Sequence, residues 1–229
     1  MFDKNLFNYD SENHVGYYNG ELVPSITQLL EVFYPLSSDI PTERLTKAAE
    51  RGTEVHALVE KINKLYRNYG EEDARAFAYM CDNKDALNYY RFLKAYKLLP
   101  YSFEEEVYLM DHNQDLISYG HYDIILLATE TITVGDKVLF EKDKLYLFDL
   151  KTVSQLEEQK VQSQCEFYRT AYNQNNTIKV ELPTCALKIR DDEVKLYYFD
   201  KTKEDTFIVD RALIMKGMWE SRWWHLKSN

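Results

Sequence analysis

Two opposite charges at the end of one apolar segment are the first candidates for chemistry. Residues 146–152 read YLFDLKT, so Asp149 is followed two positions later by Lys151. In a β-strand, residues two positions apart point to the same face, and the two side chains are therefore expected to lie side by side. The end of a buried strand has little reason to carry both charges unless they pair or take part in a reaction.

A second carboxylate lies on another apolar segment. Asp123 ends the sequence GHYD and precedes the apolar residues 124–127. If the two segments are neighbouring strands, Asp123 and Asp149 can converge on one divalent ion, and hard oxygen ligands suit Mg²⁺ or Mn²⁺. Such an ion lowers the pKa of a bound water and polarises a phosphoryl oxygen. Lys151 would then supply positive charge where negative charge develops during phosphodiester hydrolysis.

The elements that must position these residues predict a mixed α/β fold. Helical spacing and breaking residues indicate helices over residues 25–34, 42–51, 54–69, 73–98, 155–174 and 208–226. Runs rich in Tyr, Val, Ile and Leu indicate strands over residues 103–110, 118–128, 131–140, 144–150, 184–190 and 194–199. This order favours a central mixed β-sheet flanked by α-helices. We expect one domain over residues 1–229, with a helical part (25–98), a catalytic sheet core (103–199) and a C-terminal helix (208–226).

Three local signals set the boundaries of the N-terminal helices. Ser25 and Gln28 have the spacing of a capping box, which satisfies backbone groups at the start of a helix. Pro35 is expected to end that helix. Gly52 is expected to break the next one, with Thr53 capping a new helix.

The composition excludes several classes of protein. The chain has 28 Lys and Arg against 38 Asp and Glu, and 14% of its residues are aromatic, which argues against disorder. The acidic balance counts weakly against nucleic acid as a partner, because phosphate binding depends on Lys and Arg. A local basic groove remains compatible with it. The candidates for such a groove are Lys151, Lys160, Lys179, Lys188 and Arg169.

The cysteines and the hydropathy bear on the setting of the protein. Cys81, Cys165 and Cys185 are far apart, which favours a reducing, cytoplasmic setting and argues against a zinc or iron–sulfur site. No apolar run approaches the roughly 18 residues that a membrane span needs. The first ten residues lack the basic and apolar regions of a signal peptide.

In combination, these residues resemble the PD-(D/E)XK nuclease superfamily, and more closely its RecB-like branch, which includes the phage lambda exonuclease. Asp123 and Asp149-x-Lys151 resemble the family's metal-binding core. Further matches are residues 51–56 (RGTEVH) to its RGTxxH element, Gly120-x-x-Asp123 to GxxD, Gln164-x-x-x-Tyr168 to QxxxY, and residues 23–27 (VPSIT) to its PSVT opening. Each motif is weak alone, but their order over residues 23–168 is more specific.

One feature departs from the family pattern. The gap between Asp123 and Asp149 is longer than usual, and residues 130–143 are interpreted as an insertion in a hairpin. The insertion contains none of the motif residues. It could alter access of DNA or assembly of the protein.

The resemblance implies a restriction-endonuclease-like core and a role for each matching residue. The implied catalytic residues are Asp123, Asp149 and Lys151. The implied ligands of Mg²⁺, for which Mn²⁺ can substitute, are His56, Asp123, Asp149 and the carbonyl of Leu150. Gln164, Tyr168 and Arg51 are implied to bind substrate, and the first two are four residues apart on one helical face, from which they could also orient Lys151. Glu106 and His121 are further candidates, although Glu104 and Glu105 leave the strand register open.

The implied activity is that of a Mg²⁺-dependent deoxyribonuclease. It would act as an exonuclease on DNA ends in phage recombination or repair, in the cytoplasm of a bacterial host. Relatives work as ring-shaped trimers beside a strand-annealing protein, and no iron–sulfur cluster is expected here. Two alternatives stay open: a structure-specific endonuclease that uses the same site, and a catalytically idle member that binds DNA or a protein.

The remaining candidates have simpler interpretations. Trp219, Trp223 and Trp224 have helical spacing and are expected in the core or at a subunit contact, with base stacking as the alternative. His112 and His225 show no metal-ligand spacing and are interpreted as structural.

Overall fold

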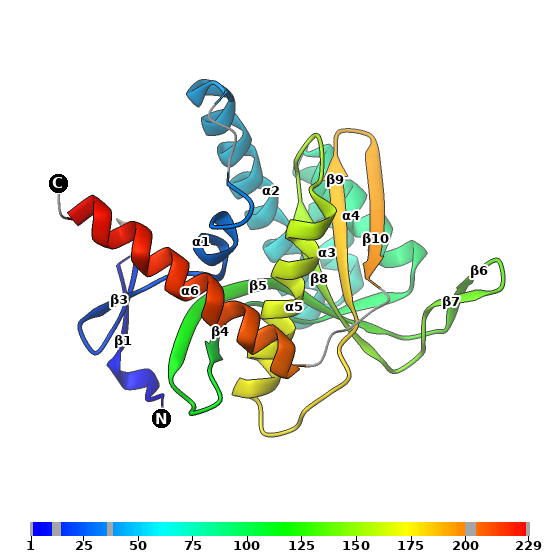
Figure 1. The fold of residues 1–229 in the computed structure, drawn as a ribbon. Coiled ribbons are helices and arrows are strands. Elements are labelled where there is room, and N and C mark those ends of the chain that lie inside the picture. Colours follow the sequence, from blue (N-terminus) through cyan, green and yellow to red (C-terminus); the bar gives the residue numbers. More distant parts are fainter. Residues whose placement is uncertain (1, 11–14, 36–38, 200–204, 228–229) are drawn as a thin grey trace.

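The structure is a computed structural model that describes the chain except for residues 1, 11–14, 36–38, 200–204 and 228–229 (Figure 1). The side chains of residues 223–227 are also outside the described set, and with them the roles expected for Trp223, Trp224 and His225. Among the described helices, none combines the length and the apolar character needed to cross a membrane.

A five-stranded sheet forms the centre of the molecule (Figure 1). Its strands, in spatial order, are β10 (Glu193–Phe199), β9 (Thr184–Arg190), β8 (Leu145–Lys151), β5 (Leu116–Ala128) and β4 (Leu98–Met110). β8 and β9 are parallel, and the other neighbours are antiparallel. The sheet is therefore mixed, as the sequence predicts, and it makes β8 and β5 direct neighbours.

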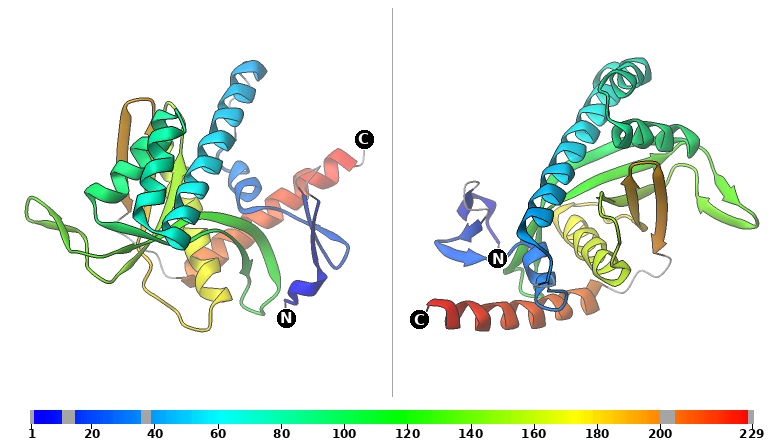
Figure 2. Two further views of the ribbon diagram at one scale, coloured as in Figure 1. Left: turned by 180° about the vertical axis from the view of Figure 1, so that it is seen from behind. Right: turned by 90° about the horizontal axis from the view of Figure 1, so that it is seen from above.

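Helices cover both faces of this sheet (Figure 2). The helices are α1 (Ile26–Glu31), α2 (Thr42–Tyr69), α3 (Glu71–Met80), α4 (Lys84–Ala95), α5 (Glu158–Asn175) and α6 (Asp205–Lys227). One apolar core joins the sheet to α2, α3 and α4, and a second joins it to α1, α5 and α6. The predicted α/β class, with helices on both sides of the sheet, is confirmed.

Alternation along β8 divides its side chains between the two cores. Tyr146, Phe148 and Leu150 pack with the α2–α4 group, and Leu147 packs with the α1, α5 and α6 group. The period of two therefore places Asp149 and Lys151 on the side of α5.

Two smaller sheets lie beside the central one. A 3₁₀ turn (Lys4–Leu6) leads into β1 (Phe7–Asp10), β2 (Val15–Tyr18) and β3 (Glu21–Val23), which pair in that order. β6 (Ile132–Val134) and β7 (Lys137–Phe140) form a hairpin that projects from the body (Figures 1 and 2). The run predicted as strand over residues 131–140 is thus two strands, and Gly135 turns the chain between them with a φ of 60°.

The N-terminal helices differ from the prediction in two places. α2 runs unbroken through Gly52. A glycine inside a helix is less stable than an alanine by only about 1 kcal/mol, and the other interactions of this 28-residue helix outweigh that difference. The helix predicted over residues 73–98 is two helices instead. Asp82 turns the chain with a φ of 50°, and the side chain of Asn83 accepts from the amide of Ala86 to cap α4.

Other boundaries agree with the sequence. Ser25 and Gln28 form the expected capping box at the start of α1. The helix predicted over residues 155–174 is α5, and the hairpin predicted at 184–199 is β9 and β10. The last helix is α6, which begins three residues before the predicted start.

Candidate metal and catalytic site

The charges predicted at the end of β8 form a buried ion pair. Nζ of Lys151 donates to Oδ1 of Asp149 at 3.0 Å and lies 2.8 Å from Oδ2. The side chain of Asp149 is 1% exposed, and that of Lys151 is 23% exposed. Both come from one strand at alternate positions, so β8 itself fixes their spacing.

A chain of hydrogen bonds leads from this lysine to α5. Nζ of Lys151 donates to Oε1 of Gln164 at 3.2 Å, and Nε2 of Gln164 donates to the hydroxyl of Tyr168 at 3.3 Å. The two α5 residues are one helical turn apart, as their spacing predicts. Gln164 therefore holds the amine of Lys151 in place, which was one of the two roles considered for it.

Asp123 joins the site from β5. β5 and β8 pair over Ile124–Leu127, and Asp123 is the residue of β5 immediately before this paired stretch. Its Oδ2 accepts from the amide of Leu150 at 2.6 Å, so a side chain continues the ladder where the backbone pairing stops. This contact places the carboxylate of Asp123 at the point where the two strands separate.

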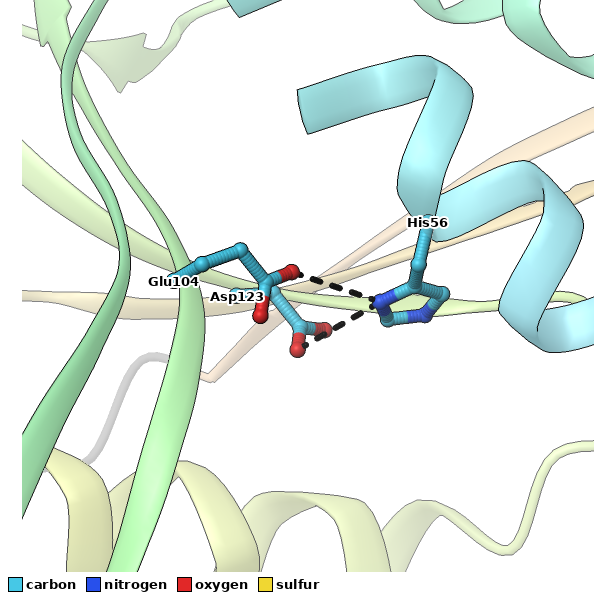
Figure 3. A group of neighbouring side chains, drawn as sticks. All are labelled: His56, Glu104 and Asp123. Carbon is cyan, nitrogen blue, oxygen red and sulfur yellow. Dashed lines mark ion pairs between the residues drawn. The ribbon is translucent and has the colours of Figure 1, made fainter. Parts of the chain in front are cut away.

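His56 faces two carboxylates from the opposite side (Figure 3). Its Nδ1 lies 3.6 Å from Oε1 of Glu104 and 3.7 Å from Oδ1 of Asp123. One ligand atom from each of these three residues lies within 4.8 Å of the other two. α2 contributes the histidine, β4 the glutamate and β5 the aspartate, so the group exists only when helix and sheet are packed together.

The carboxylate from β4 is Glu104 and not Glu106. The β4–β5 register pairs Phe103 with Ile124 and Glu105 with Tyr122, which sets Glu104 across from Asp123. Glu104 has a φ of 52°, a left-handed conformation that strand alternation does not foresee.

Glu106 lies elsewhere. Its carboxylate is 3.3 Å from Nζ of Lys4 and accepts a hydrogen bond from Tyr108. The run of three glutamates was the available signal in the sequence, but it did not choose among its members.

Burial and mutual charge shift the ionisation of the site. Burial raises the pKa of Asp149 to about 6, against the opposing effect of Lys151. Burial likewise raises the pKa of Asp123, against the nearby charges of His56 and Lys151. Burial alone would lower the pKa of His56, but Glu104 and Asp123 outweigh it and raise that pKa to about 9. Protonated His56 and Lys151 thus compensate the carboxylates in the protein by itself.

The donor set fits a divalent cation. Nε2 of His56 lies 3.2 Å from the carbonyl oxygen of Leu150. When Nε2 donates this bond, the lone pair of Nδ1 is left to face the carboxylates, which is the usual arrangement for a metal-ligating histidine. Oδ2 of Asp149 is buried and, despite its proximity to Lys151, receives no hydrogen bond from the described residues. The Leu150 carbonyl, expected as a direct ligand, is engaged by the histidine instead.

Arg51 and His121 lie outside the three-residue group. The guanidinium of Arg51 lies 2.6 Å from Asp85 and 3.0 Å from Asp191, so it joins α2 to α4 and to the β9–β10 turn. His121 is exposed and lines a cavity with Tyr168. The structure therefore gives Arg51 a scaffold contact and places His121 beside the site.

The residues proposed for a basic groove are largely engaged. Lys188 is buried and pairs with Glu193, and Arg169 pairs with Asp205. Lys160 donates to the carbonyl of Tyr34. Lys179 is exposed. Apart from Lys151, this set does not gather at the carboxylates.

Two of the residues interpreted as structural are placed by the structure. Trp219 is 8% exposed and belongs to the core that includes α5 and α6. His112 lies 2.8 Å from Asp210 of α6.

Comparisons with known proteins give little information. No protein-family model matches the chain, and no curated protein matches it significantly. A solved structure described as "Crystal structure of SSO0001" is similar over 83% of this chain and 82% of its own, with 14% identity and a TM-score of 0.35. This degree of similarity carries no inference about function, which must rest on the site.

Proposed function

We propose that the protein is a Mg²⁺-dependent deoxyribonuclease that hydrolyses DNA phosphodiester bonds. The observation that carries the proposal is the convergence of the buried carboxylate of Asp149 and the half-buried carboxylate of Asp123 with the amine of Lys151. A partly exposed lysine held by an aspartate and a glutamine is positioned to meet an anion. The adjacent group of His56, Glu104 and Asp123 supplies the ligands that a divalent ion needs.

Each residue has a distinct task in this proposal. His56, Glu104 and Asp123 would hold the ion, with Asp149 completing the site. The ion supplies a Lewis acid and a more acidic bound water. Lys151 stabilises negative charge on the phosphoryl oxygens, and Gln164 keeps its amine directed into the site. Tyr168 fixes the amide of Gln164 in turn.

The finer parts of the proposal rest on the family resemblance. They are an exonucleolytic action on DNA ends in phage recombination or repair, a cytoplasmic setting, a strand-annealing partner and assembly as a trimer. Mn²⁺ would substitute for Mg²⁺, which agrees with a site that combines one imidazole with carboxylates.

The test compares linear and circular DNA. End-labelled linear duplex and a relaxed circle of the same sequence are incubated with Mg²⁺ or Mn²⁺ and with the wild type, Asp149→Asn or Asp136→Asn. Asp136 is an exposed residue of the β6–β7 turn and serves as the matched control. We expect metal-dependent loss of linear DNA with the wild type and the control only.

The other outcomes are equally informative. Nicking of the circle would establish the endonuclease alternative. No cleavage by a folded wild-type protein, as judged by circular dichroism, would refute the nuclease proposal. Retained cleavage by Asp149→Asn would remove Asp149 from the mechanism.

A further inference from the structure

The cavity that His121 and Tyr168 line has no function in the proposal so far, apart from the contact of Tyr168 with Gln164. Its volume is about 350 Å³, which is at the lower end of the range for small-molecule sites. It is lined by Tyr9, Ser25, Ile26, Thr27, Gln28, Tyr119, Gly120, His121 and Tyr168. The residues come from β1, the start of α1, β5 and α5, so four separate parts of the chain build it.

One contact and one strand position connect the cavity with the catalytic site. Tyr168 lines the cavity and also accepts the hydrogen bond from Gln164 that ends the chain from Lys151. His121 lies two residues before Asp123 on β5, a separation of about 7 Å along a strand. A ligand group in the cavity and a phosphate at the carboxylates would therefore be close neighbours in one molecule.

The packing of the cavity wall is tight and specific. A side chain added at Gly120 would place its Cβ 2.8 Å from Cε1 of Tyr168, so only glycine allows the tyrosine ring to lie against β5. The hydroxyl of Ser118 donates to the carbonyl of Pro24 at 2.8 Å and fixes the start of α1 to the same strand. These contacts give the cavity a preformed shape.

The chemistry of the lining favours an uncharged ligand. None of its residues is a lysine or arginine, and His121 is the only one of them that can become a cation. The backbone amides of Ser25 and Gln28 are already used by the capping box, because they donate to Oε1 of Gln28 and to Oγ of Ser25, respectively. A phosphate would thus find little to neutralise it.

The same lining offers aromatic faces and neutral polar groups. Tyr9 is 39% exposed and Thr27 is exposed, so one aromatic ring and one hydroxyl are accessible at the entrance. An unpaired base can stack on an aromatic ring and form hydrogen bonds with neutral polar groups. Every base has a face that can stack, so this binding does not depend on the nucleotide sequence.

We propose that this cavity binds one unpaired nucleobase of the substrate strand, beside the phosphate that is cleaved. The inference rests on the proposed nuclease function and names its substrate class: a strand whose terminal region is single-stranded or frayed. The base is held by Tyr9 and by the neutral polar groups of the wall. Its sugar and phosphate lead toward Lys151.

The test measures binding without cleavage. The protein is Asp149→Asn with Ca²⁺, and the probe is a fluorescein-labelled 12-nucleotide single strand of mixed sequence. A set of otherwise identical strands carries one abasic nucleotide at successive positions. We expect one position at which loss of the base weakens binding about tenfold, the scale of one stacked base.

A cavity-filling variant then assigns that position to the cavity. Thr27→Phe places a ring in the space from an exposed position, and Thr133→Phe makes the same change on the exposed face of the β6–β7 hairpin. We expect Thr27→Phe to weaken binding of the intact strand about tenfold and to abolish the abasic effect. Thr133→Phe should leave both unchanged.

Three results would overturn the inference. They are equal binding of all abasic strands, an abasic effect that survives in Thr27→Phe, and a large loss when a terminal phosphate is replaced by hydroxyl with no abasic effect. The last result would assign the cavity to a phosphate. Metal-dependent cleavage by the wild type separates these results from failure of the nuclease function itself, since cleavage would persist when only the cavity assignment is wrong.

Discussion

The raised pKa of Asp149 predicts that the free energy of unfolding depends on pH, and that Asp149→Asn should reduce this dependence. Burial moves that pKa from 3.8 to about 6, so the folded protein binds a proton at this carboxyl more tightly than the unfolded chain does. The protonated carboxyl therefore contributes stability below pH 4, and this contribution is lost as the pH rises through 6. A shift of about two units at 1.36 kcal/mol each corresponds to about 3 kcal/mol.

The measurement compares the wild type with Asp149→Asn in buffers that contain EDTA. Between pH 3 and pH 7 the wild type should lose about 3 kcal/mol of unfolding free energy relative to the variant. For a chain of this size that is a relative fall of about 6 to 12 °C in Tm. Asp136→Asn is the control, and its profile should run parallel to that of the wild type.

Mg²⁺ provides the complementary arm of the experiment. At pH 7 a concentration one hundred times the Kd should raise the stability of the wild type by about 2.7 kcal/mol, and it should raise that of Asp149→Asn much less. Parallel pH profiles of the wild type and Asp149→Asn would refute the assigned pKa shift. Equal stabilisation of both by Mg²⁺ would remove Asp149 from the ion's surroundings.

Three further predictions concern neighbouring residues. Because the pKa of His56 is raised from 6.5 to about 9, its contribution to stability is present below pH 6.5 and lost as the pH rises through 9, so urea unfolding of His56→Gln should show a flatter profile over that window. Gln164→Leu should lower kcat between about ten- and a hundredfold with little change in KM, because it frees the catalytic amine; an unchanged kcat would show that the amide does not position it. Gly120→Ala should destabilise by about 1–3 kcal/mol through the clash with Tyr168, whereas Gly217→Ala, which meets nothing within 4 Å, should leave thermal stability equal or higher.

Local pattern was sufficient for the parts of the site that lie within one element. Asp149 and Lys151 share a strand face, and Gln164 and Tyr168 share a helix face, because spacing in the sequence fixes both relations. The capping box at Ser25 is local for the same reason. The α/β class followed from the order of such segments.

Relations across elements were harder to predict. Glu104 reaches the site through a left-handed backbone conformation, which strand alternation does not predict. Because residues 104–106 are all glutamates, the sequence did not indicate which of them faces Asp123. Arg51 lies in a motif that suggested substrate binding, but the structure pairs it with residues 34 and 140 positions away. Gly52 is helical because the other 27 residues of α2 stabilise the helix on both sides of it. The sequence pattern considers only the low helix propensity of glycine itself.

The pairing of Arg51 with the β9–β10 turn has a consequence for how the protein is made. Arg51 and Asp191 are 140 positions apart, and a ribosome adds about 5–20 residues per second. The helix that carries His56 is therefore made roughly 7 to 28 s before the hairpin to which Arg51 binds. During this interval the nascent chain lacks β9 and β10, so the edge of β8 that pairs with β9 has no partner strand. We expect the nascent chain to depend most on a chaperone at this stage of synthesis.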